Sequence, residues 1–267
     1  MSKGYDLIKL IDNEETRLIE YEELIVKRDE LLKAAGSYLT VYTAEFGDMI
    51  TANFELKIEC IKKKKTINYC RRRMNRGLSI DADRMKDEIE LEMKLYNDEL
   101  KAMIDDTKNC KNAKNVGTFR FERAKKTYRK LAKLIHPDIN KKTMEDENLR
   151  ELWERIVNAY NHSDIDELDD LEVLVLRSLD ELGESGFMPG YDDLEERIER
   201  IERQINDIIT TEPYVYGEIL KDEAKKEELK AQLQLEYNNY KEYLEILTNT
   251  LDEMLREGGI TWVWKLD

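Results

Sequence analysis

Apolar residues recur every three or four positions along most of the chain, and charged residues fill the positions between them. Side chains at this spacing share one face of an α-helix, so the pattern predicts amphipathic helices. The first stripe consists of Leu7, Leu10, Ile11, Leu18, Tyr21, Ile25 and Leu32. Gly36 is expected to end this helix, because glycine readily takes the left-handed conformation that follows a helix.

Two more helices complete a predicted N-terminal segment, residues 1–110. The second helix is expected to stop at Asn75-Arg76-Gly77, and the third to start near Asp81 and Asp83, which suit a first turn by capping and by the helix dipole. Their stripes are Phe46, Ile50, Phe54, Ile58, Ile61 and Ile67, then Met85, Ile89, Met93, Tyr96, Leu100 and Ile104. Such stripes need apolar partners, so this segment predicts an antiparallel helical bundle or coiled coil.

The C-terminal segment, residues 188–267, is predicted to be a helical hairpin. Pro189-Gly190 precedes it, Glu212-Pro213 interrupts it and Gly258-Gly259 ends it. Its stripes are Leu194, Ile198, Ile201, Ile205 and Ile208, then Leu229, Leu233, Tyr237, Tyr240, Leu244, Leu247, Leu251 and Leu255. The tail with Trp262 and Trp264 alternates apolar and polar residues. It is expected to pack on the bundle as a strand or extended segment, and the alternative is an exposed docking motif.

Composition supports an all-α class. Charged residues make up 39% of the 267 residues and there are only three prolines, which favours long helices with solvated faces. The net charge of −15 argues against the whole chain binding nucleic acid or an anionic membrane. No apolar run approaches the roughly 18 residues that span a bilayer, and the N-terminus has no apolar signal core. A cytoplasmic protein without a membrane partner is therefore expected.

Little in the chain points to a cofactor or to catalysis. Cys60, Cys70 and Cys110 match neither a disulfide framework nor a zinc pattern, so reduced structural thiols are expected. His136 and His162 are the only histidines, and no glycine-rich phosphate loop is present. Hydrolytic catalysis needs a nucleophile paired with a base, so the chain is not expected to be an enzyme or to carry a metal.

A basic run lies between Lys57 and Arg76. It consists of Lys57, Lys62, Lys63, Lys64, Lys65, Arg71, Arg72, Arg73 and Arg76. One interpretation is a phosphate-contacting patch, which would make nucleic acid a partner. The favoured interpretation is a solvated helix face paired with neighbouring acidic helices, because apolar residues interrupt the run at helical intervals.

The middle segment, residues 111–187, carries the most specific chemistry. Between Lys114 and Lys142 there are ten basic residues and only two acidic ones, Glu122 and Asp138. On a helix, Ala124, Tyr128, Leu131 and Ile135 share one face, whereas Lys126, Arg129, Lys130 and Lys133 share another. Pro137 stops this helix and holds His136 and Asp138 in a rigid turn. A second helix follows with Leu149, Leu152, Trp153, Ile156 and Tyr160, and antiparallel packing of the two would expose the basic face together with the turn.

Residues 118–165 resemble a J-domain of the DnaJ type. The resemblance rests on Tyr-Arg-Lys-Leu-Ala at 128–132, His-Pro-Asp at 136–138 and a following helix that ends in Ala159-Tyr160. It implies a helical hairpin that binds a DnaK-type chaperone, with Lys126, Arg129, Lys130 and Lys133 as the docking face and His136, Pro137 and Asp138 as the trigger of the chaperone's ATPase. Tyr128 would be part core and part contact, and Trp153 and Ile156 would be core positions.

The chain departs from the family pattern at several places. The aromatic-rich first helix common in J-domains is not recognisable before Thr118, so it is either missing or replaced by a helix of the N-terminal bundle. Ile139 stands where the family usually has a lysine. The Gly/Phe-rich linker and the zinc-binding cysteine repeats of fuller DnaJ proteins are absent. These departures leave the partner chaperone open.

The resulting prediction is a co-chaperone or adaptor whose helical arms bind a client or associate with each other. The alternative is a structural scaffold with a degenerate J-like fold. Residues 164–182 form a predicted acidic helix, which also raises the hypothesis that acids of this chain mask the basic face. The alternative for that helix is an ordinary solvated surface.

Overall fold

The computed structural model describes residues 2–112, 118–183 and 194–257, with side chains from Thr16 onward except at 118, 119 and 257. Every regular element in these residues is an α-helix, which confirms the predicted all-α class. The helices are α1 (Ser2–Met74), α2 (Ala82–Asn112), α3 (Thr118–Ile135), α4 (Lys142–Glu145), α5 (Glu147–His162), α6 (Ile165–Glu181), α7 (Leu194–Thr210), α8 (Tyr216–Leu220) and α9 (Glu223–Glu257). They form two compact units, one of Met1–Tyr38 and Lys114–Gly217, the other of Leu39–Ala113 and Glu218–Asp267.

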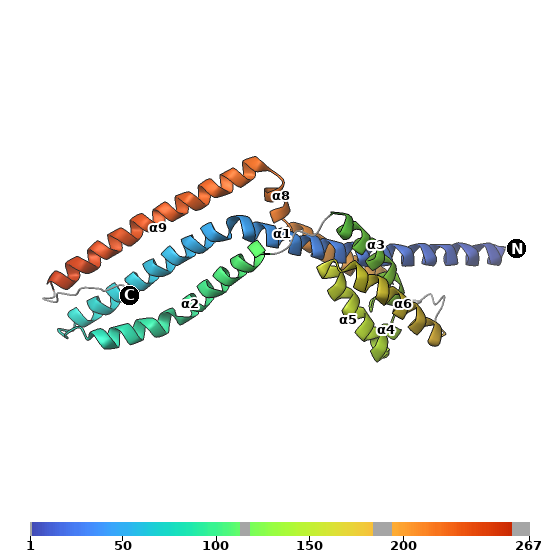
Figure 1. The fold of residues 1–267 in the computed structure, drawn as a ribbon, viewed down its shortest axis with the longest axis horizontal. Helices are drawn as coiled ribbons and strands as arrows, with labels where there is room; N and C mark the ends of the chain where they lie inside the picture. Colours follow the sequence, from blue (N-terminus) through green and yellow to red (C-terminus); the bar gives the residue numbers. More distant parts are fainter. Residues whose placement is uncertain (1, 113–117, 184–193, 258–267) are drawn as a thin grey trace. The chain divides into compact units, whose positions relative to one another are not determined.

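The second unit is built from three long helices. Figure 1 shows α2 and α9 on either side of the later part of α1. Their stripes meet in one apolar cluster that contains Ile58, Ile67, Met85, Met93 and Leu251. The predicted boundary between the first two of these helices is confirmed, because α1 ends at Met74, Gly77 has a φ of +64°, and the Asp81 carboxylate accepts from the Arg84 N–H at 3.1 Å.

The predicted helix end at Gly36 is wrong, because α1 continues without interruption from Ser2 to Met74. A glycine inside a helix costs only about 1 kcal/mol relative to alanine. Apolar stripes on both sides of Gly36 bury side chains such as Val26 and Phe46, and each such burial is worth about 1.5–3 kcal/mol. Packing therefore outweighs the local preference of the glycine.

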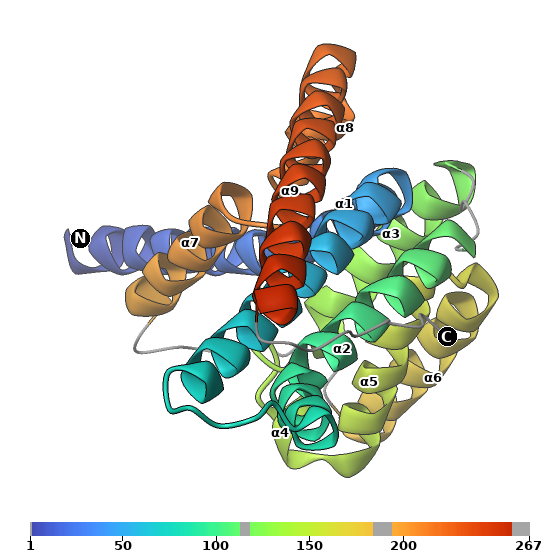
Figure 2. The same cartoon turned by 90° about the vertical axis from the view of Figure 1, so that its left-hand side faces the viewer.

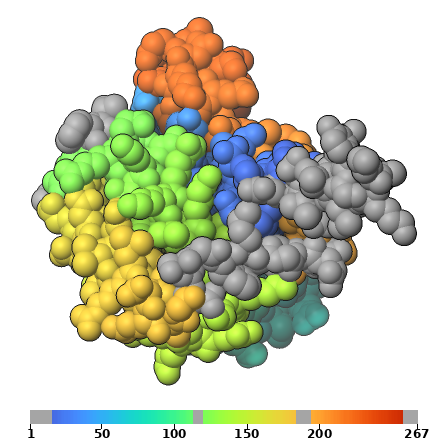
Figure 3. Space-filling view, turned by 90° about the vertical axis from the view of Figure 1, so that its right-hand side faces the viewer, coloured from blue at the N-terminus to red at the C-terminus, as the bar shows by residue number. Residues whose placement is uncertain are grey.

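The core of the first unit lies between α3, α5 and α6 (Figure 2). Tyr128 contacts the Tyr160 ring and His136 contacts the Trp153 ring, so α3 and α5 run antiparallel, as their patterns predicted. The largest side chains fully buried there are Leu131, Ile135, Leu149, Ile156, Leu168 and Leu171. Figure 3 shows α3, in green, beside α6, in yellow, on the surface of this unit.

The early part of α1 packs with α7 in a separate apolar cluster. Leu18, Tyr21 and Ile25 of α1 meet Ile198, Ile201 and Ile205 of α7. The Arg17 guanidinium is ion-paired with the Glu195 carboxylate beside this cluster. We call residues 16–38 of α1 together with α7 the cover, because they lie over the turn that follows α3.

The two units divide the chain differently from the three predicted segments. Helices α7 and α9 were predicted to form one hairpin, but α7 belongs to the first unit and α9 to the second. Stripes on two helices show that each needs a partner without saying which partner it takes. The predictions for Pro189-Gly190, Gly258-Gly259, Trp262 and Trp264 lie outside the described residues.

Three simple properties hold for the described part of the chain. None of its helices combines the length and apolarity that crossing a bilayer requires. Its three cysteines are free thiols, with Cys60 and Cys70 buried. No group of three or more His, Cys, Asp or Glu side chains in it could hold a metal ion.

Candidate functional site

The turn after α3 is a compact structure closed by its own hydrogen bonds. Pro137 cannot continue the helix, which ends at Ile135. The N–H groups of Ile139 and Asn140 both donate to the His136 carbonyl, at 2.9 and 2.7 Å, and the Asn140 side chain donates to the Leu134 carbonyl at 3.1 Å. These bonds hold His136 and Asp138 in one fixed arrangement at the end of the basic helix.

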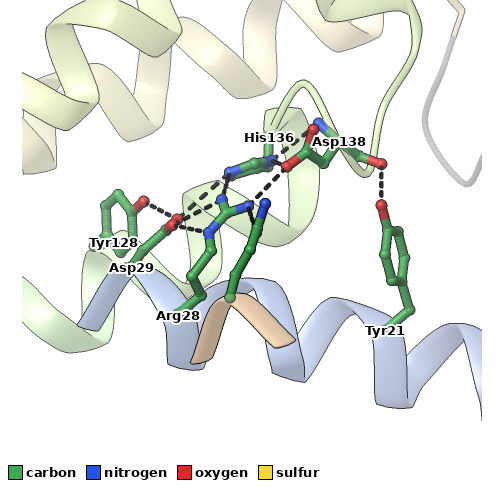
Figure 4. A network of polar contacts seen from close by, with 7 residues as sticks. Tyr21, Arg28, Asp29, Tyr128, His136 and Asp138 are labelled. Atoms are coloured by element: carbon green, nitrogen blue, oxygen red, sulfur yellow. Dashed lines mark hydrogen bonds and ion pairs between the residues drawn. The ribbon is translucent and has the colours of Figure 1, made fainter. Parts of the chain in front are cut away.

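His136 is buried, with only 5% of its surface exposed. Its ring meets the Trp153 ring edge-on, with 4.6 Å between the centroids. The His136 Nδ1 accepts a hydrogen bond from the Asp138 N–H at 3.0 Å, so the proton of a neutral imidazole is on Nε2. That nitrogen lies 3.4 Å from the Asp29 carboxylate of α1, which can accept its proton in a hydrogen bond (Figure 4).

Asp138 is held by two residues of α1. Its carboxylate pairs with the Arg28 guanidinium at 3.2 Å, and its carbonyl accepts from the Tyr21 hydroxyl at 3.4 Å (Figure 4). At the start of the next helix, the Asn140 side-chain oxygen accepts from the Lys142 N–H at 3.0 Å. Asp138 therefore binds α1 through both its side chain and its main chain.

Asp29 is the central acceptor of this network. The Tyr128 hydroxyl donates to its carboxylate at 2.6 Å, and Arg28 pairs with the same carboxylate at 2.8 Å. Burial by itself raises the pKa of Asp29. The hydrogen bond from His136, the charge of Arg28 and the hydrogen bond from Tyr128 outweigh burial, so the pKa lies below its ordinary value. Asp29 is thus a partly buried carboxylate held in its charged form.

Arg129 and Lys130 of the basic face, together with three neighbouring cations of α3, are paired with acids of this chain. Glu30 of α1 contacts both Lys125, at 3.3 Å, and Arg129. The acidic helix α6 pairs with the other side of the face, through Asp166 with Arg120 at 3.8 Å, Asp169 with Arg123, and Glu172 with Lys130 at 2.5 Å. Two acidic helices therefore flank the predicted docking face.

Part of the face stays open. Lys126 and Lys133 are both exposed, and Lys126 makes no ion pair with any residue that the structure describes. A groove of about 580 Å³ lies beside Lys126, lined by Glu122, Arg123, Thr127, Lys130 and Glu172. This groove is one accessible part of the basic face.

Lys33 anchors α1 at the far end of α5. Its ammonium donates to the Tyr160 carbonyl at 2.6 Å and to the Ser163 hydroxyl at 3.0 Å, and it lies 3.7 Å above the centre of the Tyr160 ring. A cation is favourable at the carboxyl end of a helix. Burial lowers the pKa of Lys33 to about 8. We call the contacts of Tyr21, Arg28, Asp29, Glu30 and Lys33 with the turn, α3 and α5 the α1 joint.

The structure corrects one sequence prediction about this site. The basic face and the turn were expected to be exposed together, but His136 is buried and α1 covers the turn. Tyr128, predicted to be part core and part contact, is only 2% exposed and stacks on Tyr160 with 4.0 Å between ring centroids. The physical reason is that α1 supplies a complementary surface, in which Tyr21, Arg28 and Asp29 contact the turn. Glu30 contacts α3 beside it.

Sequence reasoning missed the residues of α1 that complete the site. Arg28, Asp29 and Glu30 follow Lys27, which comes after three adjacent apolar residues, Leu24, Ile25 and Val26. Adjacent apolar residues widen a helical stripe to a second neighbour, and that was the available signal. Val26 does enter the core between α3, α5 and α6, while Ile25 packs against α7.

The basic run of the second unit has acidic neighbours as well. Lys65 pairs with Glu92 of α2, and Arg72 pairs with Glu88 at 3.2 Å. The Arg73 guanidinium donates to the Ser79 carbonyl. These contacts are of the kind expected from a solvated helix face with acidic partners.

Comparisons with known proteins add no relative to this picture. No protein-family model matches the chain. No curated protein shows significant similarity to it. No solved structure matches it either. The resemblance of residues 118–165 to a J-domain therefore stays a prediction from the sequence.

Proposed function

We propose that the chain is a co-chaperone or adaptor that docks a DnaK-type chaperone through α3 and the His136–Asp138 turn and stimulates its ATPase. The observation that supports this is the combination of a basic helix, a rigid His-Pro-Asp turn and an antiparallel partner helix in one compact module. The chain supplies no catalytic group in this mechanism. Its basic residues steer an acidic surface of the chaperone, and the turn makes the contacts that favour hydrolysis.

A single-turnover ATPase assay tests this proposal. The full chain is added to a DnaK-type chaperone loaded with ATP, and the rate is compared with that given by His136→Gln. His162→Gln is the matched control, because His162 is the other histidine and is exposed at the end of α5. We expect stimulation by the wild type and by His162→Gln, and none by His136→Gln.

The proposal is contradicted if neither the wild type nor a variant with an uncovered turn, such as Glu30→Lys, stimulates the ATPase. Stimulation that survives His136→Gln would also contradict it, because the activity would then come from another surface. In both cases circular dichroism must show that the variants keep their helices.

A structural scaffold is the second candidate, and the burial of His136 favours it. The imidazole and the Asp138 carboxylate already have partners within the chain, as structural groups do. A scaffold predicts that His136→Gln lowers the thermal unfolding temperature while no chaperone responds to the wild type. The co-chaperone proposal predicts loss of stimulation at concentrations where the variant is fully folded.

The arms are proposed to bind a client or a second copy of the chain. Exposed apolar side chains on α2 and α9 support this, including Leu91, Leu95, Leu235 and Ile246, each at least 60% exposed. Light scattering after size-exclusion chromatography distinguishes the two partners. Self-association through α2 predicts a molecular mass that doubles as the protein concentration rises. The double variant Leu91→Lys, Leu95→Lys should then have the mass of one chain.

A further inference from the structure

We propose that the cover is an intramolecular competitor of the chaperone, so that the His136–Asp138 turn is available for docking only when the cover separates from α3. This inference rests on the function proposed above and concerns the regulation of the same surface. It assigns a role to residues 16–38 of α1 and to α7, which the resemblance to a J-domain does not include.

The first support is that the cover and the module beneath it have separate apolar cores. The cover buries Leu18, Tyr21 and Ile25 against α7, whereas α3, α5 and α6 bury their side chains against one another. Among the described residues, Val26 is the buried member that α1 contributes to the module's cluster, and Ile139 is the buried member that the turn contributes to the cover's cluster. Each part can therefore keep most of its apolar contacts when the two separate.

The second support is that the contact between the two parts is mostly polar. Arg28 pairs with Asp138, Asp29 with His136 and Tyr128, and Glu30 with Lys125 and Arg129. Ion pairs can be exchanged for ion pairs with another acidic surface at little net cost, because the cations lose one carboxylate and gain another. An apolar contact offers no such exchange unless the incoming partner supplies an equal apolar area.

The third support is the identity of the groups that α1 presents. The basic face is predicted to attract an acidic partner, and Glu30 already offers a carboxylate to Arg129 of that face and to the neighbouring Lys125. Glu172 of α6 does the same for Lys130. The exposed Lys126 and the groove beside it remain for a first encounter with an acidic chaperone surface while the turn is still covered.

The consequence is a closed state that binds weakly and an open state that binds strongly. The apparent affinity of the chaperone is reduced by the fraction of molecules that are open. Weakening the contact between α1 and α3 should raise that fraction without touching the turn, the docking residues or the core of the module.

Charge reversal at Glu30 is the test. In Glu30→Lys, a lysine faces Lys125 and Arg129 and repels both. Glu55→Lys is the matched control, because Glu55 is an exposed glutamate of the same helix in the second unit. Asp29→Asn is a milder second variant if the charge reversal lowers the helix content. All variants are compared as full-length chains.

Opening is measured without the chaperone, from the reaction of the histidines with diethyl pyrocarbonate, mapped by mass spectrometry. The exposed His162 gives an internal reference for the buried His136. We expect His136 to react much more slowly than His162 in the wild type. Glu30→Lys should accelerate the reaction of His136 alone, and Glu55→Lys should change neither rate.

Docking is measured from the concentration that gives half-maximal ATPase stimulation. We expect Glu30→Lys to lower it about tenfold, as a tenfold larger open fraction would, and Glu55→Lys to leave it unchanged. Equal reactivity of both histidines in the wild type would overturn the inference, because no closed state would exist. If Glu30→Lys accelerates the reaction of His136 but leaves the concentration for half-maximal stimulation unchanged, the inference is also overturned, while the proposed function stays intact. No stimulation by any variant, opened ones included, would overturn the proposed function and the competing role of the cover with it.

Discussion

The core between α3, α5 and α6 and the α1 joint hold the same helix in two different ways. On one face of α3, fully buried side chains such as Leu131 and Ile135 pack against α5 and α6. On the neighbouring face, α3 and its turn meet α1 through ion pairs and hydrogen bonds to Arg28, Asp29 and Glu30. Apolar packing is stable and accepts many apolar partners, whereas a polar contact is specific and can be replaced by a contact with another group of the same charge.

This difference gives the two regions different expected responses. Losing an apolar group from the core removes contacts that nothing replaces. Losing a charge from the joint leaves exposed groups such as Arg129 able to bind water, and only buried donors such as His136 and Tyr128 lose a partner outright. The free energy of unfolding should therefore depend mainly on the core, and access to the turn mainly on the joint.

Leu131→Ala should have the largest effect on stability. Leu131 is fully buried between α3, α5 and α6, and a truncation of this kind costs about 2–5 kcal/mol. Urea unfolding followed by circular dichroism measures the loss. Val173→Ala is the control, since Val173 of α6 is 67% exposed and its truncation should change stability by about 0.5 kcal/mol or less. Equal losses in the two variants would remove the distinction between core and surface.

Asp29→Asn should cost less, about 1–3 kcal/mol, because His136 and Tyr128 lose their charged acceptor while the volume is kept. Asp87→Asn, at an exposed position of α2, is the matched control and should be neutral. The same urea titration compares the two. A loss in Asp29→Asn as large as that in Leu131→Ala would mean that the joint, like the core, carries the stability of the unit.

The stabilising effect of Asp29 should disappear in acid. Its pKa is lowered in the folded protein, so the unfolded chain takes up a proton first as the pH falls. The contribution is complete above the unfolded pKa of about 4 and is lost as the pH falls through the lower pKa of the folded state. The difference in unfolding free energy between wild type and Asp29→Asn should therefore shrink below about pH 4. A difference that stays constant between about pH 7 and pH 3 would show that the Asp29 charge does not stabilise the joint.

Residue spacing was sufficient to predict the core. Leu131, Ile135, Leu149, Leu152, Ile156 and Tyr160 were all expected on inward faces, and all are buried. The acidic helix after Asp164 was also predicted, and Asp164 caps it by accepting from the Glu167 N–H at 3.3 Å. Helical periodicity predicts burial directly, because the positions of a helix that face a core carry apolar side chains along its whole length.

The same reasoning could not predict the joint or the continuity of α1. Charged residues such as Arg28 and Asp29 look in the sequence like any solvated position, and their burial depends on which helix is placed opposite. Gly36 looked like a helix end because its local preference was read without the packing on both sides of it. The turn at His136 was located correctly, but its exposure was not, because exposure is a property of neighbours that lie over 100 positions away in the sequence.

The smallest effect on stability is expected at the outer edge of the basic face. Glu172→Gln removes the carboxylate that pairs with the exposed Lys130, and a surface pair of this kind contributes about 0–1 kcal/mol. Glu151→Gln, at an exposed position of α5, is the control. The small loss should vanish at about 1 M salt, where charges are screened over about 3 Å. If Glu172→Gln instead raised the reactivity of His136 as much as Glu30→Lys, the acids of α6 would act as part of the cover, and the ion pairs between α6 and α3 would belong to the polar contact that controls access to the turn.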